Sequence, residues 1–263
     1  IRLGRQSIKI DNVRFIGNVE FRQVMQVFNG VLLENKSLPN TELLIGHMGR
    51  IKSINATQRE AKVEILHAQY RWRPNNNIIG YAYLQDDANL AGAAANVTDL
   101  SNQIIGLRLD GAHALSEKLA LLYTAEYATQ SDYAGGDSKI DADYYHVGIG
   151  PRWGDWYLRL DQERLASNDG QYAFQTPLGT NHLFQGWADQ FLTTPRQGLR
   201  DTFLMAGGKL GKAQLLAEYH RLKSDVGGID FGDEVDFSVA YPFLKQLTGK
   251  LEYADYQIGD ASA

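Results

Sequence analysis

The chain has 263 residues, enough for one large domain or two small ones. Its formal net charge of −5 argues against non-specific binding to nucleic acid, and the absence of cysteine excludes disulfides, thiolate metal sites and thiol catalysis. No apolar run reaches the roughly 18 residues of a transmembrane helix, although the alternating strands of a membrane barrel would escape this criterion.

Bulky and polar residues alternate with a period of two along almost the whole sequence, and helical periodicity is hard to find. Several alternating segments reach about twelve residues, which is longer than strands of soluble sheets and long enough for a tilted strand to cross a bilayer. The pattern predicts thirteen strands, which in chain order are 2–9, 20–34, 41–53, 61–73, 77–86, 102–113, 117–130, 142–153, 155–165, 199–210, 212–223, 233–244 and 247–258.

From residue 73 onward the predicted connections alternate between short and long. Residues 73–77 and the Gly154-Asp155 turn are short, whereas 87–101, 131–141 and above all 166–198 are long. Tight turns at one rim and long loops at the other are the plan of an outer-membrane barrel. The sequence therefore predicts an all-β fold, an antiparallel transmembrane β-barrel with short periplasmic turns and long extracellular loops in the bacterial outer membrane.

Each predicted strand has one apolar face and one face with charges of both signs. Trp156, Leu158 and Leu160 alternate with Arg159 and Asp161. A soluble barrel would bury the apolar face, and alternation alone does not separate that arrangement from a membrane barrel. The number of strands, the aromatic residues at strand ends and the mixed charges favour a lipid-facing apolar face and a hydrated lumen.

Charged side chains on the polar faces are candidates for lining the lumen and setting selectivity. They are Arg5, Arg22, Arg71, Arg73, Arg108, Arg152, Arg159, Arg200, Asp161, Glu163, Glu126 and Glu218. Trp72, Trp153, Trp156 and Tyr241 are predicted to form an aromatic belt at the level of the lipid headgroups, with Tyr81 and Tyr83 as further candidates.

Thirteen strands is an odd number, whereas bacterial single-chain barrels normally have an even one. We therefore expect residues 1–263 to be a single β-barrel domain, incomplete at one or both ends, within a barrel of roughly 14–18 strands. The alternative is a strand hidden at 183–190.

The longest connection, 166–198, is too apolar for a solvated loop. It contains Phe174, Leu178, Phe184 and Trp187, which should pack against something. Packing inside the barrel as a constriction and packing outside on neighbouring loops are both compatible with the sequence.

The motifs of enzymes are missing from the sequence. The six histidines show no metal-ligand spacing, and no nucleophile motif or dinucleotide fingerprint occurs. We therefore expect no enzymatic activity, no cofactor and no resident metal. Two Asp-rich stretches, 132–143 and 224–234, could hold Ca²⁺ through carboxylates, but they lack EF-hand spacing and solvated loops are preferred.

Two stretches resemble the alginate-export family of outer-membrane β-barrel porins. Residues 3–35 contain Gly4-Arg5-Gln6, Asp11-Asn12, Arg14-Phe15-Ile16-Gly17 and Phe21-Arg22-Gln23, and residues 184–204 contain Trp187-Ala188-Asp189, Phe191-Leu192, Pro195 and Gly198-Leu199-Arg200-Asp201. The resemblance covers about a fifth of the chain. It implies a passive porin whose arginine-rich lumen guides an anionic polysaccharide. This chain departs from that pattern, because its polar faces carry acidic residues as well as arginines.

Two functional hypotheses follow. The first is a channel for passive passage of small or anionic solutes, including saccharides or uronates, through a charged lumen. The second is a non-conducting structural or partner-binding barrel, and a soluble ligand-binding β-protein is a weaker third. The expected partners are the lipid bilayer and small or anionic solutes, with no nucleic acid; a homo-oligomer or an envelope partner is compatible with the sequence.

Overall fold

The computed structural model describes residues 1–88, 90 and 96–260, and within them one antiparallel sheet contains all the long strands. Each strand of this sheet pairs with the strands that precede and follow it in the sheet order. The strands are β1 (Arg2–Gln6), β2 (Val27–Asn35), β3 (Thr41–Lys52), β4 (Gln58–Arg73), β5 (Asn76–Asp86), β6 (Asn102–Ala114), β7 (Leu119–Asp132), β8 (Asp141–Trp153), β9 (Trp156–Leu165), β12 (Leu199–Leu210), β13 (Ala213–Lys223), β14 (Asp230–Leu244) and β15 (Leu247–Ile258).

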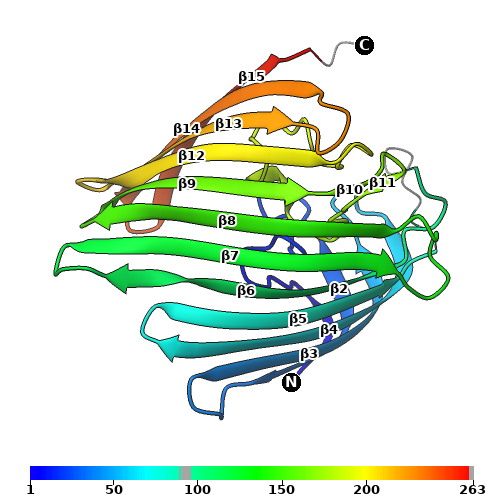
Figure 1. Ribbon diagram of the computed structural model, residues 1–263. Coiled ribbons are helices and arrows are strands. Elements are labelled where there is room, and N and C mark those ends of the chain that lie inside the picture. Colours follow the sequence, from blue (N-terminus) through cyan, green and yellow to red (C-terminus); the bar gives the residue numbers. More distant parts are fainter. Residues whose placement is uncertain (89, 91–95, 261–263) are drawn as a thin grey trace.

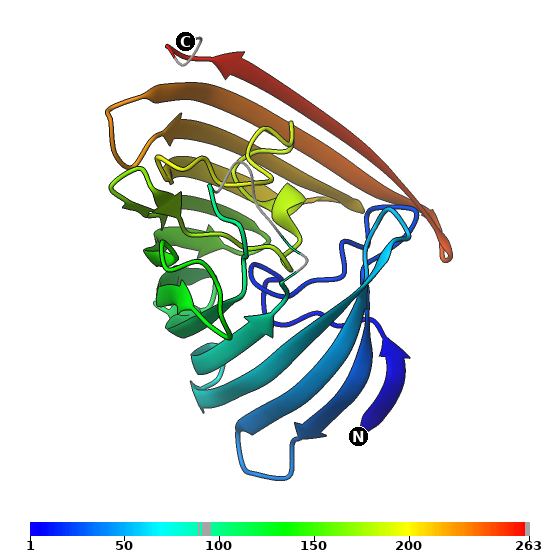
Figure 2. The same ribbon diagram turned by 90° about the vertical axis from the view of Figure 1, so that its right-hand side faces the viewer.

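The sheet curls around an interior that is occupied by chain, as Figure 2 shows. Strands β1 and β15 are the two ends of the sheet, and no pairing between them occurs among the described residues. The short turns gather at the left-hand rim of Figure 1 and the long connections at the opposite rim. We call these the short-turn rim and the long-loop rim. Within the part of the chain described, no helix is long and apolar enough to cross a membrane.

The thirteen predicted strands are confirmed, with the largest differences near the N-terminus. The predicted strands 2–9 and 20–34 are shorter in the structure, because residues 7–26 leave the sheet and enter its interior. Ile8 and Ile16 become buried there, which the alternating pattern alone could not indicate. The alternative strand at 183–190 is absent from the described residues; a short 3₁₀-helix, η1 (Asn181–Leu183), precedes it.

The two faces of the sheet have the polarity that the alternation predicts. Leu107 and Leu160 are exposed on the convex face, while Glu126 and Asp161 are buried on the concave face. An apolar convex face is what lipid requires, and a concave face with charges suits a hydrated lumen. Near the long-loop rim, however, the concave face also carries apolar side chains such as Ile65, because the chain inside the curled sheet covers them.

The short-turn rim carries outward-facing aromatic residues. Gly154 and Asp155 form the turn between β8 and β9, with Gly154 at a φ of +57°, and Trp153 pairs directly with Trp156 across it. The Trp156 ring lies over Gly208, where an added Cβ would come within 2.4 Å of it. Exposed side chains at this rim include the predicted belt residues Trp72, Trp153, Trp156 and Tyr241.

Tyr81 and Tyr83 do not belong to this belt, which corrects the sequence-based expectation. Both are buried on the concave face of β5, where they stack on each other with ring centroids 5.1 Å apart. The Phe15 ring lies 5.3 Å from that of Tyr81 and 5.3 Å from that of Tyr144, and 5.9 Å from that of Phe174. The hydrophobic core is therefore inside the curled sheet, between the wall and the enclosed chain.

Candidate functional site

Residues 7–26 and 166–198 fold together inside the sheet, and we call them the inserted segments. The Gly17 amide donates a hydrogen bond to the Leu178 carbonyl (2.9 Å), and the Thr180 amide donates to the Val13 carbonyl (2.9 Å). The second segment also contains its own small hairpin, β10 (Ser167–Asn168) paired with β11 (Tyr172–Ala173). These bonds make the two segments one body in the lumen, so 166–198 packs inside the sheet rather than outside it.

A buried ion pair attaches the inserted segments to β9. Arg14 Nε donates to Glu163 Oε1 at 2.7 Å, and both side chains are almost completely buried. Glu163 also accepts hydrogen bonds from Tyr144 Oη (2.7 Å) and Gln185 Nε2. Arg14 lies over the Phe184 ring, 4.5 Å from its centroid. One wall carboxylate thus holds both inserted segments.

The opposite wall holds the second inserted segment through backbone amides. The Ala188 amide donates to Glu234 Oε1 at 2.6 Å and the Trp187 amide donates to Asp236 Oδ2 at 3.2 Å. Gly186 has a φ of +85°, and a Cβ there would lie 2.3 Å from the Glu234 carboxylate. Glycine therefore favours this close approach, because it leaves room for the carboxylate and adopts a φ that other residues rarely do.

A cavity of about 200 Å³ lies between the inserted segments and the concave wall. Its lining carries charges of both signs and a few apolar side chains. The residues are Asn12, Arg108, Thr124, His146, Arg159, Asp161, Glu163, Leu183, Phe184, Gln185, Phe203, Met205, Glu218 and His220. Wall strands supply nearly all the charged groups, so the sheet sets the electrostatics and the inserted segments set the width.

The two arginines of this cavity differ in how much of their hydrogen-bonding capacity is used. Arg159 donates to both oxygens of Asp161, at 3.1 and 2.5 Å, and to Thr124 Oγ1 at 3.2 Å. Arg108 lies 3.4 Å from Asp110, and its Nε and Nη1 have no hydrogen-bond partner among the described residues. Arg108 is thus less fully hydrogen-bonded than Arg159, although these two nitrogens are buried.

A second cavity of about 240 Å³ lies where the inserted segments meet the 53–59 region. Arg22 lines it, 3.4 Å from Asp189 Oδ2, and the Phe21 ring stacks on His182 with centroids 4.1 Å apart. The inserted segments line both this cavity and the first one. Arg22 is therefore a residue of the inserted segments, not of a wall strand.

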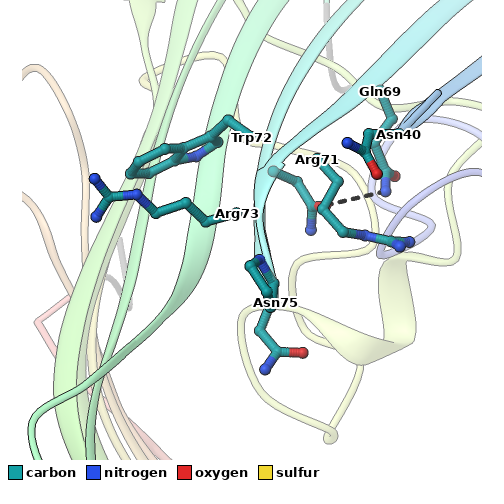
Figure 3. A pocket seen from close by; sticks show the side chains of 8 residues that line it. Asn40, Gln69, Arg71, Trp72, Arg73 and Asn75 are labelled. Carbon is teal, nitrogen blue, oxygen red and sulfur yellow. Dashed lines mark hydrogen bonds between the residues drawn. The ribbon is translucent and has the colours of Figure 1, made fainter.

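A cavity of about 620 Å³ is a groove at the short-turn rim rather than at the inserted segments. Arg71 faces the interior side there, and its amide donates to the Asn40 carbonyl at 2.8 Å. Figure 3 shows Arg73 on the other side of the strand, against the Trp72 ring, 4.7 Å from its centroid. The lining of this groove contains arginines but no acidic side chain and no residue of the inserted segments, so we assign the functional site to the cavity at the inserted segments.

Most of the predicted lumen residues face the interior. Paired residues across antiparallel strands share a face, which places these side chains on the concave side. They are Arg71, Arg108, Arg152, Arg159, Asp161, Glu163, Glu126 and Glu218.

Three predicted lumen residues lie elsewhere, which corrects their assignment. A register shift between Arg71 and Arg73 moves Arg73 to the outer side. Arg200 pairs with Arg164 on the outer face, and both contact Asp225. Arg5 lies on the exposed edge strand, where its Nε donates to Asn29 at 3.2 Å. Assigning a residue to a face by counting alternate positions along a strand fails at bulges, and it depends on the register of short edge strands.

Sequence reasoning placed Glu218 on a polar face but missed the buried cluster on β12, β13 and β14 to which it belongs. Its members are Asp201, Glu218, His220, Glu234 and Asp236. The available signal was the i, i+2 spacing of Glu218 with His220 and of Glu234 with Asp236 in adjacent strands. Aligning the two strands pairs Glu218 with Asp236 and His220 with Glu234, which puts all four side chains on one face.

The Asp-rich stretches are used for ion pairing and turns. Burial alone would raise the pKa of Asp225, but hydrogen bonds from Arg164, the Ser167 amide and Arg200 outweigh it and lower the pKa. At Asp137 hydrogen bonds from the Lys139 and Thr98 amides, with other contacts, lower the pKa. Neither stretch forms a group of metal-ligating side chains within the described residues.

No protein-family model matches the chain, and no curated protein matches it. Solved structures do match. Pseudomonas aeruginosa OpdQ has a TM-score of 0.77 at 14% identity, covering 98% of this chain and 73% of that one. Pseudomonas aeruginosa OccK7 (OpdD) has a TM-score of 0.73 at 15% identity, with 97% and 69% covered. Acinetobacter baumannii OccAB2 has a TM-score of 0.73 at 14% identity, with 96% and 67% covered.

At these identities the likeness establishes the fold: an all-β antiparallel sheet of the kind found in outer-membrane porin barrels. The matches are with OprD/Occ-type porins. They give no support to the alginate-export family in particular.

Proposed function

We propose that this chain forms an outer-membrane channel through which small solutes pass passively. The observation that carries the proposal is the charged cavity between the concave wall and the inserted segments. A polar passage narrowed by chain inside an apolar-faced sheet is the arrangement that selects solutes by size and charge. The likeness in fold to outer-membrane porins supports this proposal and the outer-membrane location.

The charges at the cavity favour solutes that carry a carboxylate. Arg108 on β6 and Arg159 on β9 both line the cavity, and Arg108 Nε and Nη1 have no hydrogen-bond partner among the described residues. Guanidinium groups bind carboxylates through paired hydrogen bonds. Glu218 and Glu163 in the same lining would discourage a densely charged polyanion, so a small uronate or a short acidic saccharide fits this proposal better than alginate, whose export stays a prediction.

Lipid cannot hydrogen-bond the free edges of β1 and β15. We therefore propose that further strands complete the wall between them, as the sequence-based expectation of a 14–18-stranded barrel requires. Lipid is then the expected partner of the convex face, and an oligomer or an envelope partner stays a prediction.

Planar-bilayer recordings test this proposal. The full-length protein should give ohmic single-channel currents with a preference for anions in a salt gradient. Arg108→Ala and Arg159→Ala should each shift the reversal potential toward cations, because each removes a positive charge from the narrow part, and Arg71→Ala should have a smaller effect at the wider rim. Arg221→Ala, on the outer face of β13, is the matched control and should leave the reversal potential unchanged.

The alternative is a non-conducting structural or partner-binding barrel. It is favoured by the tight attachment of the inserted segments to both walls through Glu163, Glu234 and Asp236. Absence of current from well-folded full-length protein, verified by heat-modifiable mobility in gels, would exclude the channel and leave this alternative.

A further inference from the structure

His220 is oriented in the wall with one ring nitrogen left unpaired. Its Nδ1 lies 2.8 Å from Asp201 Oδ2, and its ring stacks on Phe203 with centroids 5.1 Å apart and planes 20° apart. Because the Asp201 carboxylate accepts at Nδ1, that nitrogen carries a proton, and Nε2 presents a lone pair once it has released its own proton, as metal binding requires. In the part of the chain described, Nε2 has no hydrogen-bond partner.

Two carboxylates lie close to the free nitrogen. Glu218 Oε2 is 3.8 Å from His220 Nε2, and Asp236 Oδ2 is 3.7 Å from it. All three side chains are more than nine-tenths buried, and their ligand atoms all lie within 4.8 Å of one another. Asp236 Oδ1 also lacks a hydrogen-bond partner within the described chain. One nitrogen and two oxygens thus converge on one point.

The surroundings carry more negative charge than local cations neutralise. Asp201 and Glu234 lie next to the three converging groups, and each has one oxygen without a hydrogen-bond partner among the residues described. Arg159 is hydrogen-bonded to Asp161 and not to this cluster. Buried carboxylates are stable only when they are paired, protonated or bound to a metal.

We propose that Glu218, His220 and Asp236 bind one divalent transition-metal ion of the Zn²⁺ type, with Asp201 as the residue that positions the imidazole. Metal bonds of about 2.1 Å place neighbouring ligand atoms roughly 3.0–3.4 Å apart. The two spacings from His220 Nε2, 3.7 and 3.8 Å, are longer than this, and all three ligand atoms lie within 4.8 Å of one another, so metal binding has to draw the three side chains together. A mixed imidazole and carboxylate set suits Zn²⁺ and its neighbours better than Ca²⁺ or Mg²⁺. A carboxylate on the far nitrogen of a metal-binding histidine is the usual supporting contact.

An ion can reach the site through the lumen. Glu218 and His220 both line the cavity of about 200 Å³, so the remaining coordination positions face a polar space where water can complete the shell. Ligand spacing along the sequence could not reveal this site, since the three residues come from two strands and meet only through the register of β13 with β14.

Calorimetric titration of the full-length, chelator-stripped protein in detergent with Zn²⁺ tests the proposal, and Co²⁺ absorption reports the ligand type. We expect one site per chain, a Co²⁺ spectrum with nitrogen and oxygen ligands, and at least about 100-fold weaker binding in His220→Gln. Asp201→Asn should weaken binding about 10–100-fold, as loss of a supporting contact does. His47→Gln is the control, because His47 pairs with Glu64 on the exposed surface, 2.6 Å apart.

Two results would overturn the metal site. One is absence of Zn²⁺ binding to folded wild-type protein at millimolar Zn²⁺, which would mean that a protonated His220 is itself the cation of the cluster. The other is unchanged binding in His220→Gln. Where that variant does not show heat-modifiable mobility, Glu218→Gln decides in the same way. Neither readout depends on whether the protein conducts.

Discussion

The buried ion pair between Arg14 and Glu163 is the strongest single attachment of the inserted segments, and Arg14→Met tests its contribution. Methionine keeps most of the volume and the contact with Phe184 but removes the charge and the donors. Among the described residues, Glu163 then remains buried with hydrogen bonds from Tyr144 and Gln185 alone.

The expected cost follows from the burial of both partners. Removing one member of a buried pair costs about 3–5 kcal/mol, because the other charge is left without its partner. Two donors to Glu163 remain, so we expect a value near the lower limit, about 3 kcal/mol. Arg14 Nη1 reaches Thr176 and Asn181 only at 3.4 Å, so these contacts add little. Glu163→Gln in the Arg14→Met background should recover most of the loss, since no unpaired charge then stays buried.

Equilibrium unfolding in detergent, followed by tryptophan fluorescence, measures the single and double variants in one double-mutant cycle. Single-channel recording provides the second readout, because loosened inserted segments should increase both the mean current and its open-state noise. Lys9→Met is the matched control: Lys9 lies in the same segment and pairs with Glu20 at 3.0 Å, but both side chains are half exposed. Surface pairs of this kind contribute about 0–1 kcal/mol.

A coupling free energy between Arg14 and Glu163 below about 1 kcal/mol would refute this reasoning, since that is the value of an exposed pair. Equal stability losses in Arg14→Met and Lys9→Met would refute it as well. Unchanged current noise in a destabilised Arg14→Met protein would show that the pair stabilises the fold without restraining the passage.

Two further predictions concern the rim and the second inserted segment. Ionised Asp225 should stabilise the fold at pH values above the pKa of an unfolded aspartate. This stabilisation is lost as the pH falls through the lowered pKa of Asp225 in the folded protein. The free energy of unfolding should therefore change less between pH 7 and pH 3 in Asp225→Asn than in wild type. A wild-type difference retained in full by the variant would contradict this. Gly186→Ala should expose the second inserted segment to limited proteolysis, because its Cβ would meet Glu234. Gly227→Ala should not, because at the same φ of +85° its Cβ would contact only Ile229, at 4.0 Å. Equal proteolysis of the two variants would assign the effect to backbone strain alone.

The sheet could be predicted from the sequence because its two faces contact different surroundings along most of each strand. Period-two alternation gave β12 (Leu199–Leu210) and β15 (Leu247–Ile258) with their observed bounds. It failed at residues 7–26, whose apolar side chains are buried by enclosure inside the sheet. An apolar residue such as Ile8 or Phe15 can be buried on the face of a strand or in a segment enclosed by the sheet. The sequence looks the same in both cases, and only the fold distinguishes the two.

The candidate site was less predictable because it depends on register. Arg108, Arg159 and Glu218 face the lumen as parity indicates, but a single bulge moved Arg73 to the other side. The His220 cluster needs the pairing of three strands, which alternation within one strand does not contain. The pairing of distant strands is set by the hydrophobic pattern and the turns of the whole sheet. The pattern within one strand therefore predicts which face a residue occupies, but not which residues it contacts.

In the proposed channel, the carboxylates that charge the interior also hold the inserted segments in place. Glu163 binds Arg14, and Glu234 and Asp236 bind the amides of 187–188. Neutralising any of them changes the field and the width of the passage together, so a change in selectivity in such a variant has two causes. Arg108 and Arg159 make no hydrogen bond to the inserted segments within the described chain. The arginines are therefore the residues at which charge selectivity can be measured separately from pore width.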